Sequence, residues 1–133
     1  MSEFPNFLML FGPNSTTLWG SAIYSFEMQA RYNRLVVTGV KKRCQDGKKF
    51  AMMPDSVAEK RYNALLQPGL DKLSMSPKFG CGSYYTNGRG QNTIAFPFHQ
   101  LYFRWLTRRI KWEDYVILEK EEGANAPELK RTK

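Results

Sequence analysis

Residues 24–32 alternate strictly between apolar and polar side chains. The apolar positions are Tyr24, Phe26, Met28, Ala30 and Tyr32, and the four residues between them are polar. A period of two over nine residues is typical of a β-strand that buries one face. The pattern therefore predicts a strand here, a turn at 31–34 and a returning strand at 35–42.

Short apolar runs bounded by turn residues predict further strands. The run at 7–11 is predicted to be a buried strand that ends at Gly12-Pro13-Asn14-Ser15. Asp46-Gly47 favours a hairpin turn before a strand at 50–53, and Asn87-Gly88 favours a second hairpin. Residues 115–118 are expected to form the last strand.

Two segments carry the periodicity of helices. Ser56 and Glu59 have the spacing of a capping box, which predicts a helix over 56–66 that Pro68-Gly69 stops. A second helix is expected at 98–109. Its apolar face would be formed by Phe98, Leu101, Tyr102, Trp105 and Leu106.

Together these elements predict an α+β fold. The expected architecture is an antiparallel sheet of four to six strands with two helices. The chain has 133 residues, of which 42% are hydrophobic, so it is long enough to bury a core as one domain. We expect that single domain to span residues 1–118 and a polar C-terminal tail to span residues 119–133.

Positive charge is concentrated between residues 31 and 49. Seven basic residues and one acid give this window a net charge of +6, out of +8 for the whole chain. The seven are Arg31, Arg34, Lys41, Lys42, Arg43, Lys48 and Lys49. A basic β-hairpin surface attracts polyanions, and nucleic-acid phosphates bind such residues by charge. The same charges would also suit a solubilising edge of a sheet.

Six more residues are candidates for contacts with nucleic acid. They are Arg104, Arg108 and Lys111 in the second helical segment, and Tyr84, Tyr85 and Arg89 in a glycine-rich hairpin. The three basic residues share one helical face, which would follow phosphates or simply face solvent. The tyrosine rings would stack on unpaired bases or, alternatively, pack in the core.

The sequence offers no recognisable catalytic centre. His99 is the only histidine, and no serine or cysteine nucleophile motif accompanies it. Cys44, Cys81 and His99 are too isolated in the sequence to indicate a metal site. Neither a G-x-G-x-x-G fingerprint nor a P-loop is present. The sequence therefore predicts a non-enzymatic protein without catalytic residues, metal ligands or a cofactor.

Composition favours the cytoplasm as the location of the protein. Met1-Ser2-Glu3 lacks the basic start of a signal peptide, and no apolar run reaches the roughly 18 residues of a membrane span. Two cysteines, 37 positions apart, fit reduced thiols. We expect a cytoplasmic protein, in a host cytoplasm if it is viral, without a membrane partner.

The preferred hypothesis is a non-enzymatic nucleic-acid-binding protein that uses the basic hairpin, with single-stranded DNA or RNA among its ligands. In element order, four strands and a helix over residues 6–67 resemble Whirly-type and transcription-coactivator single-strand-binding domains. The alternative is a small interaction protein that binds an acidic protein surface. It would be an accessory subunit of a nucleoprotein assembly or a phage-type inhibitor of a nucleic-acid-processing complex. The sequence leaves the oligomeric state open.

Overall fold

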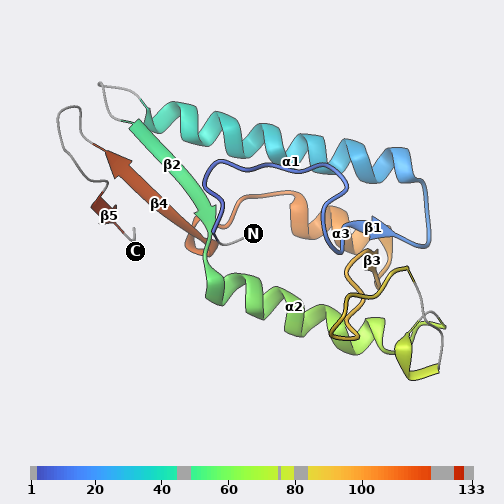
Figure 1. Ribbon diagram of the computed structural model, residues 1–133. Coiled ribbons are helices and arrows are strands. Elements are labelled where there is room, and N and C mark those ends of the chain that lie inside the picture. Colours follow the sequence, from blue (N-terminus) through green and yellow to red (C-terminus); the bar gives the residue numbers. More distant parts are fainter. Residues whose placement is uncertain (1–2, 45–48, 75, 80–83, 121–127, 131–133) are drawn as a thin grey trace. The chain divides into compact units, whose positions relative to one another are not determined.

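The longest element of the chain is a helix, where the sequence predicts two strands. In the computed structural model, helix α1 spans Ala22–Arg43 without a break (Figure 1). Its core residues recur at every fourth position: Met28, Tyr32, Val36 and Val40. The apolar pattern thus fits a helix as well as a strand, and no proline interrupts the segment. The predicted strands at 24–32 and 35–42 are wrong.

The structure describes residues 3–44, 49–74, 76–79, 84–120 and 128–130. Besides α1, the elements are β1 (Thr16–Thr17), β2 (Lys49–Pro54), α2 (Ser56–Leu70), β3 (Ala95–Phe96), α3 (Gln100–Thr107), β4 (Tyr115–Lys120) and β5 (Glu128–Lys130). Single 3-10 turns cover Pro77–Phe79 and Trp112–Asp114. None of the helices in the described ranges is long and apolar enough to cross a membrane.

The described strands form two small sheets rather than one. β1 pairs in parallel with β3, over two residues in each strand. β2, β4 and β5 form an antiparallel sheet with β4 at its centre, in which Met52 lies opposite Ile117 (Figure 1). The predicted α+β class is confirmed. A single sheet of four to six strands is not found in the described part of the chain.

The chain packs as two compact units, each assembled from separated segments. Unit 1 comprises residues 1–8, 31–60 and 109–133, and unit 2 comprises residues 9–30 and 61–108. The expectation of one domain over 1–118 stays a prediction. The segment expected to be a polar tail contributes β5 and the end of β4.

The core of unit 2 lies where α2, α3 and β3 meet. Leu66 and Leu70 of α2, and Ala95 and Phe96 of β3, are almost fully buried. The Phe96 ring contacts Phe103 of α3 edge to face, with ring centroids 5.0 Å apart. Burial of each large apolar side chain stabilises a fold by about 1.5–3 kcal/mol. This cluster therefore fixes the two residues of β3 against the helices.

A second core, in unit 1, joins the C-terminal part of α1 to the antiparallel sheet. Val36 of α1, Met52 of β2 and Ile117 of β4 are buried together. Beside them, the hydroxyl oxygens of Tyr32 and Tyr115 lie 2.6 Å apart and share a hydrogen bond. Burial raises the pKa of Tyr32, as does the negative charge that Tyr115 would carry, and burial is also the main cause that raises the pKa of Tyr115.

Four other elements lie where the local sequence patterns predict them. Helix α2 begins at Ser56, as expected, and ends at Leu70 rather than at residue 66. Helix α3 lies within the predicted range 98–109. Strands β2 and β4 cover the predicted ranges 50–53 and 115–118. Each of these segments carries its signal within a few neighbouring residues.

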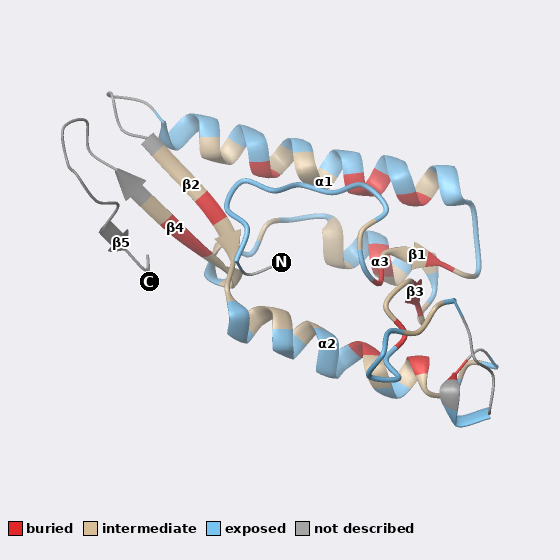
Figure 2. Cartoon of the chain, viewed as in Figure 1, coloured by how far each residue is buried: buried red, intermediate tan, exposed pale blue. Residues whose placement is uncertain are grey.

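The hairpin turn expected at Asp46-Gly47 lies outside the described residues. Two other expectations fare differently. At Asn87-Gly88 the chain makes a tight turn, closed by one isolated bridge between Thr86 and Asn92 rather than by a ladder. Residues 7–11 belong to no strand and are exposed (Figure 2). The prediction of a buried strand there is wrong. Phe11 adopts a left-handed conformation, with φ of 59°, which ends any extended course of this segment.

The first prediction concerns Gly39, which lies in α1 against the indole of Trp112. A Cβ atom at position 39 would lie 2.5 Å from both Cζ2 and Cη2 of that ring. Alanine normally stabilises a helix by about 1 kcal/mol relative to glycine, but here the rigid ring must move. We therefore expect Gly39→Ala to lower the free energy of unfolding by about 1–3 kcal/mol in a urea titration.

Thr38→Ala is the matched control for Gly39→Ala, because Thr38 is exposed on the same helix. It should stabilise the protein slightly, by less than about 0.7 kcal/mol. In a Trp112→Leu background, the penalty at position 39 should disappear. A stabilising effect of Gly39→Ala in the parent protein would contradict the described packing.

The second prediction concerns the phenol of Tyr62 in α2. Burial, with a smaller contribution from Tyr102, raises the pKa of Tyr62 to about 12. An unfolded tyrosine ionises near pH 10, so the unfolded state releases its proton first as the pH rises. The stabilising contribution is complete below about pH 10 and is lost between about pH 10 and 12.

Tyr62→Phe should therefore flatten the loss of stability that urea titrations record from about pH 10 to about pH 12. Tyr84→Phe removes the hydroxyl of a side chain that is 90% exposed, and this variant is the matched control. Equal slopes for the parent protein and Tyr62→Phe would show that this phenol is not buried in solution.

Candidate functional site

The junction between β1 and β3 joins two segments that are far apart in the sequence. The backbone N–H of Asn14 donates to the carbonyl of Thr93 at 2.9 Å, and that of Thr16 donates to Ile94 at 3.4 Å. The parallel pairing of β1 with β3 continues this contact. We call residues 12–17 together with residues 92–96 the Asn14 cluster. All of these residues belong to unit 2.

Asn14 holds the two segments together through its side chain. Its amide Nδ2 donates to the carbonyls of Asn92 and Ala95, at 2.9 Å each. Its own carbonyl accepts from the hydroxyl of Tyr62 at 3.4 Å. The residue is buried and has a left-handed backbone, with φ of 52°. Asparagine tolerates this conformation and also supplies two donors, which no apolar side chain offers.

Asn92 organises the other half of the cluster. Its Oδ1 accepts from the backbone N–H groups of Ile94 at 3.1 Å and Ala95 at 3.0 Å. An amide flipped by 180° would point its NH₂ group at two donors, so the orientation of the side chain is settled. Its Nδ2 is consequently left without a hydrogen-bond partner among the described residues, although it is fully buried.

A second buried group in the cluster is also unsatisfied. The hydroxyl Oγ1 of Thr16 is buried and finds no partner within the part of the chain that the structure describes. A buried polar group without a hydrogen bond costs about 1–3 kcal/mol, and such groups are rare in folded proteins. Two of them in one small junction make the Asn14 cluster the candidate site within the described part of the chain.

Backbone strain lies beside the unsatisfied groups. Phe11, directly before the cluster, has a φ of 59°, a conformation that a bulky side chain rarely adopts. Its N–H donates to Oε1 of Gln29, and its ring stacks on Phe26 with centroids 5.0 Å apart. Strain of this kind persists only where neighbouring contacts enforce it, and it is concentrated at functional sites.

Polar side chains on α1 hold the segment before and through β1. The Nε2 of Gln29 donates to the carbonyl of Ser15 at 3.2 Å. One turn earlier, the hydroxyl of Ser25 lies 2.9 Å from that of Thr17 and accepts from Nε2 of Gln100 at 3.2 Å. Because Gln29 and Ser25 are both buried, these bonds fix the loop to one face of the helix.

The basic residues predicted from the sequence form no β-hairpin. Five of them lie exposed on α1: Arg31, Arg34, Lys41, Lys42 and Arg43. Lys48 and the side chain of Lys49 lie outside the described residues. The last turn of a helix favours positive charge, because the helix dipole is negative there. This accounts for the three consecutive basic residues at the end of α1 without any ligand.

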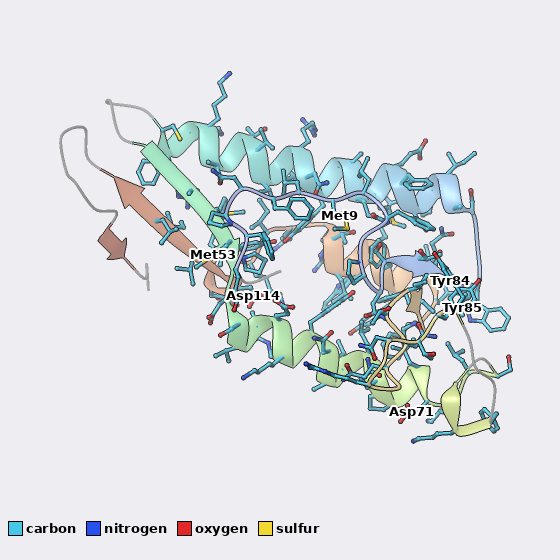
Figure 3. The ribbon with its side chains drawn as sticks, in the orientation of Figure 1. Met9, Met53, Asp71, Tyr84, Tyr85 and Asp114 are labelled. Carbon is cyan, nitrogen blue, oxygen red and sulfur yellow. The ribbon has the colours of Figure 1, made fainter. Side chains whose placement is uncertain are left out.

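The other candidate residues lie mainly in unit 2 and are largely exposed. Tyr84 is in contact with the less exposed Tyr85, edge to face, as Figure 3 shows. Arg89 is exposed in the turn after them. Nη1 of Arg104 donates to the hydroxyl of Tyr24 at 2.7 Å. Two further exposed basic residues are Arg108, which stacks on Trp105, and Lys111, which belongs to unit 1.

His99 has a local role in the structure. It precedes α3, and its Nδ1 accepts from the backbone N–H of Leu101 at 3.2 Å, which caps the helix. Within the described ranges, no three histidine, cysteine, aspartate or glutamate side chains are grouped as metal ligands would be. The Asn14 cluster consists of neutral hydrogen-bonding groups, among which Thr16 Oγ1 and Asn92 Nδ2 are buried without a described partner.

Sequence reasoning missed the residues of this cluster. Sequence patterns predict only a turn at Gly12-Pro13-Asn14-Ser15, and they indicate no role for Asn92. A signal was present: four polar residues with short side chains, Asn14 to Thr17, follow a run of apolar ones. Such residues bind backbone groups locally, but their distant partners are invisible in the sequence.

Comparison with known proteins relates the chain to flavin enzymes. It is 30% identical to a Baeyer-Villiger monooxygenase of Streptomyces coelicolor and 31% identical to one of Pseudomonas aeruginosa, over 94% and 86% of its length. It is 26% identical to the FAD-binding monooxygenase BOA2 of Botryotinia fuckeliana over 92% of its length. The chain spans only 24%, 21% and 23% of these three proteins. No family model and no solved structure matches it.

These names correct the function predicted from the sequence. Proteins similar to nearly the whole chain are named as monooxygenases, which contradicts a non-enzymatic nucleic-acid-binding protein. The same finding contradicts the small interaction protein, the nucleic-acid and acidic-protein partners, and the viral or phage interpretation. The error arose because the net charge of a short window was treated as the sign of a binding hairpin, whereas much of that window is the exposed face of α1.

The third prediction tests the role of Asn14. Asn14→Ala removes two buried hydrogen bonds, to the carbonyls of Asn92 and Ala95, and places alanine in a left-handed conformation. We expect the free energy of unfolding to fall by about 2–4 kcal/mol in urea titrations. Asn14→Gly keeps the backbone relaxed, so it should cost about 1 kcal/mol less than alanine does.

Asn63→Ala is the control for Asn14→Ala, since Asn63 is exposed on α2. It should change the stability by less than about 0.5 kcal/mol. If Asn14→Ala were as mild as Asn63→Ala, the junction between β1 and β3 would not depend on the Asn14 side chain.

Proposed function

We propose that this chain forms part of an FAD-dependent monooxygenase, and that the Asn14 cluster faces the flavin or the substrate beside it. The observation that carries the proposal is the similarity of 86–94% of the chain to proteins named as FAD-binding or Baeyer-Villiger monooxygenases. The structure supports it with a junction in which two buried hydrogen-bonding groups have no described partner.

The chemistry of the cluster fits a flavin. The isoalloxazine ring presents carbonyl oxygens and ring nitrogens that accept hydrogen bonds, and the phosphates present more oxygens. The Thr16 hydroxyl and the Asn92 amide are donors that lack acceptors in the described structure. Their satisfaction by a ligand would recover about 1–3 kcal/mol for each group. The donors of the cluster therefore match the acceptors of a flavin. The hydrogen bonds of Asn14 keep the junction that carries these donors rigid.

In this proposal the chain forms only a part of the flavin-binding site. The 133 residues contain no G-x-G-x-x-G fingerprint, the motif that receives the pyrophosphate of a dinucleotide at a helix N-terminus. We therefore assign to this chain the positioning of an acceptor-rich ring rather than the binding of the pyrophosphate by that motif. The flavin itself, when bound, supplies the electron transfer and the oxygen chemistry.

Within that division, each residue has a defined task. Thr16 and Asn92 would donate hydrogen bonds to the ligand. Asn14 would fix the distance between them, because its amide binds both halves of the cluster. Gln29 would maintain the strained backbone at Phe11 through the bond to its N–H. Preorganised donors of this kind lose little free energy to reorganisation when a ligand binds.

The test is a chimera with the Streptomyces coelicolor relative. Its segment that aligns with this chain is replaced by the 133 residues described above, and the bound flavin is quantified by its visible absorption. We expect the chimera to retain FAD. A folded chimera that releases all its flavin on desalting, while the parent enzyme retains it, would overturn the proposed function.

The fourth prediction separates a ligand-binding hydroxyl from a structural one. Thr16→Val removes the unsatisfied Oγ1 with little change in shape. In the chain alone it should leave the stability equal or raise it by up to about 2 kcal/mol, because an unpaired buried group is lost. In the chimera it should weaken FAD binding about 5- to 20-fold, the equivalent of one hydrogen bond.

Thr107→Val provides the matched control for Thr16→Val. The Thr107 hydroxyl has a partner, since it donates to the carbonyl of Phe103 at 2.9 Å. This variant should lose about 1 kcal/mol of stability and leave the FAD affinity unchanged. If Thr16→Val lowered the stability and spared the affinity in the same way, the Thr16 hydroxyl would be bound to water in the folded protein and not to the ligand.

A further inference from the structure

The proposed function assigns no role to the exposed turn at Asn87-Gly88. The N–H of Asn87 donates to the carbonyl of Gln91 at 3.0 Å, and the N–H of Gly90 donates to the carbonyl of Asn87 at 2.9 Å. Residues 87–91 are all exposed, and they follow Tyr84 and Tyr85, which are labelled in Figure 3. Solvent water therefore reaches this turn.

The side-chain amide of Asn87 is bound by the backbone of its own turn. Its Oδ1 accepts from the N–H of Arg89 at 3.0 Å and from that of Gln91 at 3.0 Å. Its Nδ2 donates to Oε1 of Gln91 at 3.3 Å. The two backbone donors draw electron density from the amide carbonyl, which makes the carbon Cγ of Asn87 more electrophilic.

The backbone nitrogen of Gly88 is the nucleophile next to that carbon along the chain. Its attack on Cγ closes a succinimide ring, and ring closures of this kind are strongly favoured over the corresponding bimolecular reactions. A Cβ atom placed on Gly88 would meet nothing within 4 Å, so the space around this residue is open. Within the described residues, the N–H of Gly88 donates to no acceptor.

Asn87 is the one asparagine of the chain that precedes a glycine. The residues that follow the other six asparagines are Phe7, Ser15, Arg34, Ala64, Thr93 and Ala126. A side chain on the following residue hinders the approach of its backbone nitrogen and restricts its backbone, whereas glycine has neither effect. Ring closure is therefore expected at this asparagine before any other.

We propose that Asn87 is a site of spontaneous covalent modification, at which Gly88 displaces the side-chain amide and water then opens the ring. In the first step the bond from Gly88 N to Asn87 Cγ forms and the bond from Cγ to Nδ2 breaks. Nδ2 leaves as ammonia and takes the proton of the Gly88 N–H. In the second step water adds to one of the two ring carbonyls, and the bond from that carbon to Gly88 N breaks.

The overall reaction converts an amide and water to a carboxylic acid and ammonia, and nothing is oxidised or reduced. Depending on which ring carbonyl the water attacks, the product is aspartate or isoaspartate. The reaction needs no flavin, so this inference goes beyond the proposed function and is tested separately from it.

The turn assists the first step. When Gly88 N attacks Cγ, negative charge develops on Oδ1 of Asn87. The N–H groups of Arg89 and Gln91 already lie 3.0 Å from this atom, as the donors of an oxyanion hole do. Donors fixed in this way stabilise the developing charge without a further cost of ordering them.

The two products have different effects on the hairpin. Aspartate keeps the length of the main chain and the acceptor atoms of Asn87, and it adds one negative charge beside Arg89. Isoaspartate routes the main chain through Cγ, which adds one atom to the backbone before Gly88. This longer turn no longer matches the hydrogen bonds that join Asn87 to Gly90 and Gln91.

The hairpin connects this turn to the Asn14 cluster. Thr86, directly before Asn87, forms the bridge with Asn92. The Oδ1 of Asn92 in turn accepts from the N–H groups of Ile94 and Ala95. Isoaspartate in the turn therefore loosens the contacts that orient Asn92 in the cluster.

Peptide mapping of the purified 133-residue chain tests the proposal. The chain is incubated at physiological temperature in neutral buffer for several weeks, the released ammonia is quantified, and mass spectrometry locates each converted asparagine. We expect conversion at Asn87 first, with isoaspartate among the products. An Asn87 that stays intact, or conversion that begins at another asparagine, would overturn the proposal.

Gly88→Ala tests the nucleophile. The added Cβ meets nothing within 4 Å, so the variant should fold as the parent does, and circular dichroism checks this. It should slow the loss of the amide at least about tenfold, because the methyl group hinders the attack geometry. Arg89→Ala is the matched control, since it changes an exposed side chain of the same turn and keeps the backbone donor. Equal rates for Gly88→Ala and the parent would exclude Gly88 as the nucleophile.

A synthetic peptide of residues 84–92 gives the rate without the fold. Because the two donors to Oδ1 are preorganised in the folded chain, the folded chain should lose the amide at least as fast as the peptide. A folded chain that reacts about tenfold more slowly would show that the turn protects Asn87 and would overturn its proposed assistance.

Hydrogen exchange tests the connection to the Asn14 cluster. The isoaspartate form is separated from the parent by chromatography, and its amides at Ile94 and Ala95 should exchange faster than those of the parent. Asn87→Asp, which keeps the length of the main chain, should exchange at these amides as the parent does. Equal protection in the isoaspartate form and the parent would overturn the connection.

Discussion

The hydrogen bonds of one asparagine side chain hold the two segments of the Asn14 cluster together, and the other features of this cluster depend on that contact. Asn14 joins its own loop to carbonyls 78 and 81 residues further along the chain. Two residues of parallel pairing between β1 and β3 would not hold these segments alone, because so short a ladder contributes little. The core around Phe96 supplies most of the burial nearby. The hydrogen bonds of Asn14 select which backbone segments pack beside that core.

The polar face of α1 explains how a strained loop is tolerated beside that junction. Gln29 and Ser25 are buried within a helix that also carries apolar core residues, and both bond to the loop or to its flanking strand. Buried polar networks stabilise less than apolar packing does, but they select one arrangement among several of similar burial. The N–H of Phe11, which has a left-handed conformation, donates to Gln29, and this bond helps to hold that conformation. Such a network suits a site that must present donors in fixed directions.

What the sequence predicts depends on how far apart the partners are. Local patterns of about ten residues predict helices α2 and α3 and strands β2 and β4. The structure contains all four elements. The α1 segment was mistaken for strands because apolar residues at Tyr24, Met28 and Tyr32 satisfy a period of two and a helical repeat equally well. The Asn14 cluster was missed for a different reason. Its partners are distant in sequence, and nothing in a local window distinguishes Asn14 from any other turn asparagine.

Two errors of prediction have the same physical origin: the wrong function assigned to the basic residues, and the failure to predict the Asn14 cluster. Net charge governs solubility and long-range attraction, and an exposed helix end satisfies it without any ligand. A buried donor without an acceptor is more informative, because folding has already lost the hydration free energy of that group. The basic residues of α1 are exposed to solvent, whereas Thr16 Oγ1 and Asn92 Nδ2 are buried. A ligand that met this second pair would recover free energy that the chain alone does not recover, and for this reason the proposed site is the junction of β1 and β3.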